Sequence, residues 1–315
     1  MVLKCPLKNY GSMSNLKCDE LNKIQVEYLI LDDTIEEKSY TKVNGLVSWH
    51  YSHAKGRCIK GINLVSCLVR YGDIALPIGY EAVNKDMHFC DIKTKKEKRQ
   101  SSISKNEHFR SILKKALANN IKFDYVLADN WFGARKNMEF IHYDMKKKFI
   151  IGIKTNRLVA CTEEDRKKGQ YQNLNTLHLK DGEKRIVYLK DFSFPVALIK
   201  KIFKNEDDST GILYLVTNDL ESSADRIYET YQKRWQIEVY HKSIKQNASL
   251  EKSPARAATS QKNHIFASII SYCKLEFLKM KTSLNHFAIK YKLLVKANQM
   301  AYKELNKLFS LRSCA

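Results

Sequence analysis

The sequence predicts an α/β protein in which helices flank a mixed β-sheet. Between residues 26 and 155, apolar runs typical of strands alternate with helical segments in the order β-β-β-α-β-α-β. Short β-like pieces and charged turns then dominate 156–221, and the pattern is helical over 222–315. We therefore predict a core of 26–155, a mostly β insertion of 156–221 and a helical completion of 222–315, after a short N-terminal remnant of 1–25.

The first predicted strand delivers carboxylates to the end of the sheet. Val26 to Leu31 is rich in strand-forming residues and is followed directly by Asp32-Asp33-Thr34. The next two strands, 59–70 and 74–80, are separated by Tyr71-Gly72-Asp73, a spacing typical of a hairpin turn. We therefore expect a hairpin next to a strand that ends in acidic residues.

The remaining elements follow from the same signals. The lysine-rich segment 93–99 is interpreted as a solvated loop. A second apolar strand, 125–128, ends at Asp129. Ser222 or Ser223 is predicted to cap the helix that opens the last region, because a hydroxyl can accept a hydrogen bond from the free backbone N–H groups of a first helical turn. The other expected elements are helices at 108–118, 134–145 and 285–308, and strands at 149–154, 185–189 and 211–217.

Composition indicates a polyanionic partner and argues against a membrane protein. The 315 residues include 55 Lys and Arg against 34 Asp and Glu, a formal charge of +21, while the hydrophobic fraction of 44% is that of a folded chain. The longest uncharged apolar stretch, Ile265 to Cys273, is about half of the ~18 to 20 residues that a membrane span needs. The N-terminus lacks the pattern of a secretion signal, so we expect a cytoplasmic protein.

The eight cysteines include no C-x-x-C pair, which favours free thiols over a disulfide framework or a zinc ribbon. The best remaining metal-like cluster is His50-x-x-His53, and two histidines without a second ligand pair are interpreted as a polar loop in preference to a zinc site.

Three acidic residues from separate segments could meet at one edge of the sheet. Asp32 and Asp129 follow predicted strands, and Glu238 lies on the downstream helix. Hard divalent cations prefer oxygen ligands, and two of them about 3.5 to 4 Å apart can promote phosphodiester cleavage. For each aspartate alone, an ordinary turn is the alternative interpretation.

The helix that carries Glu238 adds to this hypothesis. Tyr231, Arg234, Glu238, His241 and Lys245 fall within about 80° of one another on an ideal helix. An exposed stripe with ion pairs such as that of Arg234 and Glu238 would explain the spacing equally well. Cations on both sides of a single glutamate instead favour a metal-binding carboxylate beside DNA phosphates.

These residues resemble a known family. Tyr231-x2-Arg234-x3-Glu238-x6-Lys245 resembles the signature of DDE transposases of the insertion sequence 4 group. Leu31-Asp32-Asp33-Thr34 is similar to the family's first acidic strand, and Ala128-Asp129-Asn130-Trp131-Phe132 to its second. The separations of 97 and 109 residues between the three acidic positions also agree with the family plan. The resemblance covers roughly residues 26–278.

The resemblance implies a ribonuclease H-like fold in which Asp32, Asp129 and Glu238 bind two Mg²⁺ ions, with Mn²⁺ as a substitute. The family pattern favours Asp32 at the first position, and Asp33 is the alternative because neighbouring strand residues point to opposite faces. The resemblance further implies DNA contacts by the residues Tyr231, Arg234, Lys245 and Trp235. For Trp235, placed beside a displaced base, a core or interface position is the alternative.

The implied activity is that of a DNA transposase, which cleaves at transposon ends and transfers the strand into target DNA. We expect double-stranded DNA as partner, a homodimer assembled on it and association with the nucleoid. One alternative is a catalytically silent, truncated remnant that only binds DNA, because 31 residues precede Asp32 while full-length members carry a further N-terminal region. A host nuclease on the same fold is another.

Overall fold

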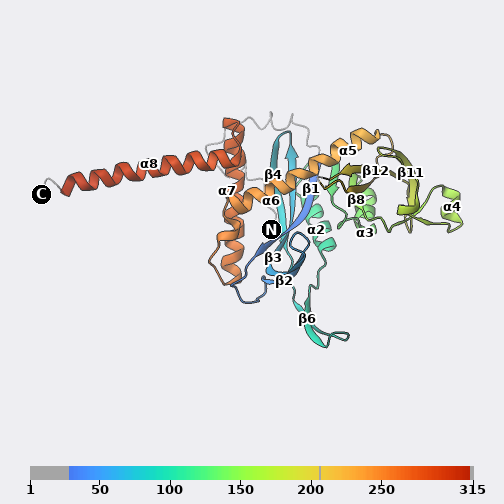
Figure 1. Ribbon diagram of the computed structural model, residues 1–315, viewed down its shortest axis with the longest axis horizontal. Coiled ribbons are helices and arrows are strands. Elements are labelled where there is room, and N and C mark those ends of the chain that lie inside the picture. Colours follow the sequence, from blue (N-terminus) through green and yellow to red (C-terminus); the bar gives the residue numbers. More distant parts are fainter. Residues whose placement is uncertain (1–27, 206, 313–315) are drawn as a thin grey trace. The chain divides into compact units, whose positions relative to one another are not determined.

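The computed structural model describes residues 28–205 and 207–312, and the chain forms two compact units, Met1–Glu238 and Val239–Ala315 (Figure 1). The predicted remnant of 1–25 lies outside the described residues.

A large mixed sheet dominates the first unit. Its described strands run in the order β10-β9-β11-β12-β13-β8-β7-β1-β3-β2, with β4 also paired to β3. The contacts of β7 with β1 and with β8 are parallel and the other pairings are antiparallel, so the predicted mixed sheet is confirmed. The strands are β1 (Tyr28–Glu37), β2 (Ser48–Ser52), β3 (Arg57–Tyr71), β4 (Ile74–Ala82), β7 (Tyr125–Ala128), β8 (Lys148–Ile153), β9 (Leu158–Ala160), β10 (Gln172–Asn173), β11 (Lys184–Leu189), β12 (Val196–Lys204) and β13 (Thr210–Thr217).

Strand β1 does not end before its aspartates, and the prediction that it does is wrong. Its parallel pairing with β7 stops at Leu31 opposite Ala128, where the apolar run also stops. Antiparallel pairing with β3 continues to Glu37 opposite Gly61. The long strand β3 supplies hydrogen-bond partners for the backbone of the polar half of β1. Asp32 and Asp33 therefore lie inside β1, just beyond the point where its pairing with β7 ends.

The lysine-rich segment 93–99 is a loop only in part. A separate two-stranded hairpin is formed by β5 (Met87–Asp91) and β6 (Lys96–Gln100); residues 93–95 lie in its turn and 96–99 in β6. The sequence pattern does not predict β6 because all its residues are exposed, so no alternation of apolar residues marks a buried face. Strands β2 and β12 are likewise not among the predicted elements.

The segment 156–221 contains strands β9 to β13, and these strands continue the main sheet of the first unit. The predicted boundaries of this segment and of the other domains stay predictions.

Helix α2 (Lys105–Ala118) covers part of one sheet face. It begins at a capping box in which Ser104 and Glu107 exchange backbone and side-chain hydrogen bonds. Its buried side chains, Phe109 and Leu113 among them, share a hydrophobic cluster with Leu29 and Leu31 of β1. After β7 the chain turns through α3 (Arg135–Glu139) and one π-helical turn (Phe140–Asp144), where the sequence predicts a single helix.

The downstream helix is divided into two by a short 3₁₀ turn. Ser223, one of the two predicted caps, accepts a hydrogen bond from the Arg226 backbone N–H at the start of α5 (Ala224–Gln232). The 3₁₀ turn Lys233–Trp235 follows, and α6 (Gln236–Gln246) continues from it into the second unit.

The second unit is helical. The long helices α7 (Ala258–Thr282) and α8 (His286–Arg312) follow a 3₁₀ turn at Leu250–Lys252, and α8 confirms the helix predicted at 285–308. Over the described residues, no helix combines the length and the apolar character that crossing a bilayer requires.

A buried ionic network joins helices within this unit. Glu276 of α7 is 2% exposed and accepts a hydrogen bond from the Tyr272 hydroxyl at 3.0 Å. The same carboxylate lies 3.2 Å from Lys279 Nζ and 3.2 Å from His286 Nε2. Burial raises the pKa of Glu276, but the hydrogen bond from His286 and the charge of Lys279 outweigh burial and hold it below its usual value.

We expect Glu276→Gln to lower the free energy of unfolding by about 2 to 3 kcal/mol, because the substitution leaves buried donors without a charged acceptor. Urea unfolding followed by circular dichroism measures the change. Glu304→Gln is the matched control, since Glu304 also pairs with a lysine three residues later but is 66% exposed. The control should lose no more than about 0.5 kcal/mol. Equal losses in the two variants would contradict a buried network.

Candidate active site

Three carboxylates of the first unit lie around one guanidinium. Asp32 lies in β1, Asp129 follows β7, and Glu238 stands in the first turn of α6. Arg234 Nη1 donates to Asp32 Oδ2 at 2.9 Å and lies 3.7 Å from Glu238 Oε1. Asp129 accepts a hydrogen bond from the Trp131 backbone N–H at 3.0 Å, and its charge also acts on Arg234. The sheet and the helical segment thus bring together all three acidic residues that the sequence singles out.

Asp32 and Asp33 are neighbours in β1, so their side chains lie on opposite faces of the sheet. Asp33 shares its face with Leu29 and Leu31, and it accepts hydrogen bonds from Lys105 Nζ at 2.7 Å and Asn63 Nδ2 at 2.9 Å. Asp32 lies on the other face, toward Arg234. The contact of Arg234 with both Asp32 and Glu238 therefore favours Asp32 over Asp33 as the partner of Glu238.

Negative charge in this site is only partly compensated. Burial raises the pKa of Asp32 to about 7; the charges of Asp129 and Glu238 add to this effect, and Arg234 opposes it. Burial also raises the pKa of Asp129, again against the influence of Arg234. The pKa of Arg234 is raised because its burial is outweighed by Tyr231 and the three carboxylates. A further cation would therefore be favourable here.

The donor chemistry fits a hard divalent cation, since carboxylate oxygens are its preferred ligands. Within residues 28–205 and 207–312, however, no three His, Cys, Asp or Glu side chains are grouped closely enough to hold a metal ion. Arg234 supplies the counter-charge to Asp32 in this arrangement. Glu238, whose side chain is 41% exposed, has room to change its orientation.

A glycine makes room for Tyr231 beside the site. A Cβ atom at Gly152 of β8 would lie 3.3 Å from the Tyr231 hydroxyl and 3.1 Å from the Asn130 backbone nitrogen. Tyr231 is 9% exposed, and burial raises its pKa to about 12. Its ring centroid lies 5.8 Å from the Arg234 guanidinium, so the tyrosine packs against the arginine that holds Asp32.

The predicted helix face is not an exposed stripe. Tyr231 and His241 are both buried, and the 3₁₀ turn at Lys233–Trp235 interrupts the regular α-helical spacing. Trp235 is 66% exposed and therefore does not occupy a core position.

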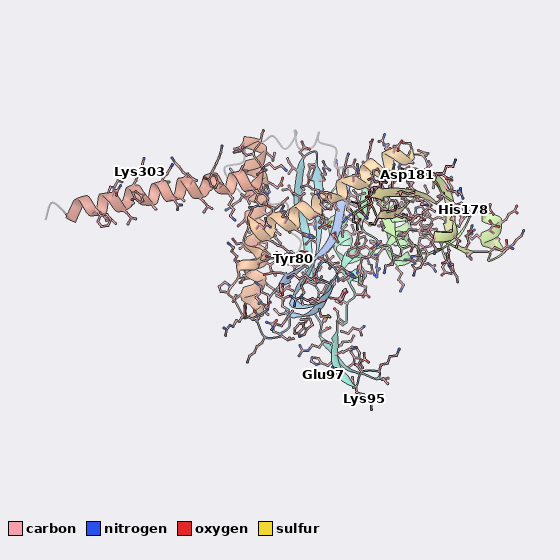
Figure 2. The ribbon with its side chains drawn as sticks, in the orientation of Figure 1. Tyr80, Lys95, Glu97, His178, Asp181 and Lys303 are labelled. Carbon is pink, nitrogen blue, oxygen red and sulfur yellow. The ribbon has the colours of Figure 1, made fainter. Side chains whose placement is uncertain are left out.

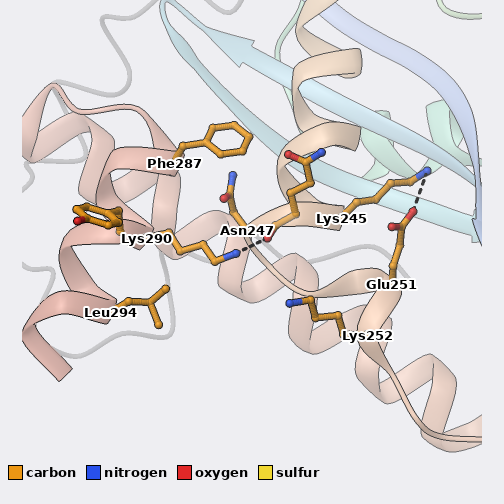
Figure 3. A pocket seen from close by; sticks show the side chains of 9 residues that line it. Lys245, Asn247, Glu251, Lys252, Phe287, Lys290 and Leu294 are labelled. Atoms are coloured by element: carbon orange, nitrogen blue, oxygen red, sulfur yellow. Dashed lines mark hydrogen bonds and ion pairs between the residues drawn. The ribbon is translucent and has the colours of Figure 1, made fainter. Parts of the chain in front are cut away.

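Lys245 belongs to the second unit, where it lies 3.5 Å from Glu251 (Figure 3). The two residues line a basic pocket together with Lys252, Lys290 and apolar residues of α8 such as Phe287. Lys290 Nζ donates to the Gln246 carbonyl oxygen at 2.5 Å within this pocket. The role of Lys245 in DNA binding stays a prediction.

One aromatic residue of the site was not predicted. Trp131 is 44% exposed, and the ammonium groups of Lys105 and Lys154 lie 5.1 and 5.6 Å from its ring centroid. Trp131 is part of the second acidic motif, but its exposure and the approach of the two lysines depend on the fold.

His50, predicted to lie in a polar loop, is instead buried in β2, where burial and the charges of Lys85 and Lys105 lower its pKa to about 4.

Comparison with known proteins identifies the family to which this chain belongs. A family model described as transposase DDE domain matches residues 86–274. No curated protein matches the chain. The chain belongs to the DDE transposase family, and its large mixed sheet with flanking helices is consistent with the ribonuclease H-like fold of these transposases.

The match includes Asp129 and Glu238 and begins after Asp32. The transposase domain implies a DNA substrate and suggests an enzyme that cleaves nucleic acid, and the family usually uses divalent metal ions. Membership of the insertion sequence 4 group stays a prediction.

The close approach at Gly152 yields a testable coupling. We expect Gly152→Ala to lower the free energy of unfolding by about 1 to 3 kcal/mol, because the new methyl group must displace the Tyr231 hydroxyl and the Asn130 backbone. Tyr231→Phe removes the hydroxyl and should recover part of this loss in the double variant. A double-mutant cycle in urea measures the coupling energy, and strictly additive losses would contradict the contact. Gly45→Ala is the control, since nothing lies within 4 Å of the position that its new methyl group would take.

Proposed function

We propose that this protein is a DNA transposase that cleaves phosphodiester bonds at transposon ends and joins the freed strand to target DNA. The observation that carries the proposal is the convergence of Asp32, Asp129 and Glu238 around Arg234 in one unit of a DDE transposase. The formal charge of +21 supports a DNA substrate, because neutralising phosphates releases counterions and strengthens binding.

In this proposal Asp32, Asp129 and Glu238 hold Mg²⁺, with Mn²⁺ as a substitute. Bound metal ions supply activation of the attacking oxygen and stabilisation of the leaving oxygen. Arg234 keeps Asp32 paired in the free protein and contacts a DNA phosphate in the complex, where a second anion competes for its guanidinium. Tyr231 limits the positions that Arg234 can take, because it packs against the guanidinium.

Three further assignments complete the proposal. Trp235 stacks on a base of the DNA end, in keeping with its 66% exposure. Lys245 binds phosphate from the second unit, where Lys252 and Lys290 share its pocket. The active form is a homodimer assembled on double-stranded DNA near the nucleoid of the cytoplasm.

A second candidate is a catalytically silent transposase that only binds DNA. The observation that favours it is the Arg234 contact with Asp32, which occupies a carboxylate that metal binding needs. A host nuclease is a third candidate, and it would cut DNA with no preference for transposon ends.

Metal dependence separates the first two candidates. We expect the purified protein to cut transposon-end DNA with Mg²⁺ or Mn²⁺ and to lose all cutting in excess chelator, since the proposed ligands are carboxylates. Gel analysis of cleavage and strand-transfer products provides the measurement. Random duplex of equal length is the control, and equal cutting of both substrates would favour the host nuclease. Cutting that persists in chelator would refute the metal site.

Substitution of the carboxylates tests the assignment of the residues. We expect Asp129→Asn and Glu238→Gln to lower the cleavage rate by about 1,000-fold or more while DNA affinity stays the same or rises, because each change removes a negative charge near phosphate. Glu229→Gln, an exposed acid on α5, is the control and should cut normally. Full activity of Glu238→Gln would show that the acidic helix is structural.

The two adjacent aspartates of β1 can be separated by the same assay. We expect Asp32→Asn to be inactive and Asp33→Asn to retain cutting within about 10-fold, because only the Asp32 face of β1 is shared with Arg234. Circular dichroism of both variants controls for folding, since Asp33 pairs with Lys105. The reverse result would assign the ligand to Asp33 and leave the proposed chemistry unchanged.

A further inference from the structure

The hairpin β5–β6 stands apart from the main sheet. Its strands pair only with each other, and of the ten residues in the two strands all but Asp91 are exposed. Figure 1 shows the hairpin projecting from the first unit, and Figure 2 shows Lys95 and Glu97 on its outer part. An isolated two-stranded hairpin is marginally stable in water, so one that projects alone is a natural site for a partner.

The base of the hairpin is fixed. Asp86 accepts hydrogen bonds from the Ser102 backbone N–H at 2.8 Å and from the Ser102 hydroxyl at 2.6 Å. These two residues flank the strands and close the ribbon where it leaves the body of the unit. The hairpin is therefore an arm with a defined attachment point.

The arm carries an excess of positive charge. Between Met87 and Gln100 there are five Lys and Arg side chains against two acidic ones. The acids are already engaged, because Asp91 pairs with Lys98 and Glu97 lies 2.7 Å from His88 Nδ1. Among the described residues, no ion pair engages Lys93, Lys95 or Lys96, while Arg99 interacts electrostatically with Glu97.

A basic cleft with aromatic walls lies at the foot of the arm. Trp49 of the edge strand β2 and Phe89 of β5 line it together with Lys85, Lys98 and Arg99. Trp49 is 56% exposed and Phe89 is 42% exposed. Lys85 Nζ donates to the Trp49 carbonyl oxygen at 2.5 Å, which fixes one cation of the cleft to β2. Cations clustered on one surface are typical of proteins that bind nucleic acid.

We propose that the hairpin β5–β6 and the cleft at its base form a second contact with duplex DNA, which grips DNA beside the position of cleavage. The cleft residues include none of the three acidic site residues, so this contact anchors DNA without taking part in the chemistry. Its unpaired cations complement phosphates, and a two-stranded ribbon has the width that the major groove of about 12 Å admits. The inference rests on the proposed function for its choice of DNA as the partner.

Neutralising the arm tests the charge contact. In Lys93→Gln/Lys95→Gln/Lys96→Gln we expect the slope of log affinity against log salt to become shallower by about 2 to 3, since each phosphate that a cation no longer neutralises lowers the slope by about 0.9. The matched control is Lys136→Gln/Lys168→Gln/Lys204→Gln, which removes the same charge at exposed lysines elsewhere in the first unit. A smaller change in the control supports a local contact. Equal changes in both variants, or no change in the arm variant, would overturn the proposal.

Removing the arm tests where the contact lies on DNA. In the second variant, two glycines replace residues 87–101, so that Asp86 can still accept its hydrogen bonds from Ser102. Hydroxyl-radical footprinting on transposon-end duplex should show loss of protection beside the cleaved position, with protection around the cleaved phosphate retained. An unchanged footprint would overturn the proposal that the arm contacts DNA. Because the footprint requires no cutting, the arm can be tested even if the wild-type protein fails to cleave, which would reject the proposed function alone.

Discussion

The contact between Arg234 and Asp32 joins the two parts of the chain on which the site depends. A strand and a 3₁₀ turn separated by 202 positions meet through one charge-assisted hydrogen bond of 2.9 Å. Burial alone would favour a neutral Asp32, and the nearby carboxylates add to that preference. The guanidinium offsets both effects. Trp235 and Glu238 follow this arginine by one and four residues, so the place where it is held limits the positions that both can take.

The features that the sequence could predict are those with a local signal. The apolar run before Asp32, the run before Asp129 and the hydroxyl cap at Ser223 each identify an element from a few neighbouring residues. The family match agrees with the transposase motifs around Asp129 and Glu238. The end of β1 was predicted wrongly because the strand continues only through its pairing with β3, which no local pattern reveals.

The features that the sequence could not predict depend on burial and on distant partners. An ideal helix places Tyr231, Arg234 and His241 on one polar face, yet the tyrosine and the histidine are buried. The two lysines beside Trp131 come from separate segments, so their approach is a property of the fold alone. The hairpin β5–β6 is not predicted because its strands are exposed, and exposed strands need no alternation of apolar and polar residues.

The strand order has a consequence for how the protein is made. Residue 28 pairs with residue 125, and Asp32 finds its arginine only at residue 234, so the site is built from contacts of high sequence separation. Such contacts form slowly because a long loop must close, at a cost in chain entropy, before the contact can stabilise the chain. On the ribosome, Asp32 of β1 and Asp129, which follows β7, emerge long before the helix that completes their surroundings. We therefore expect the nascent chain to remain without an assembled candidate site until synthesis has passed Glu238.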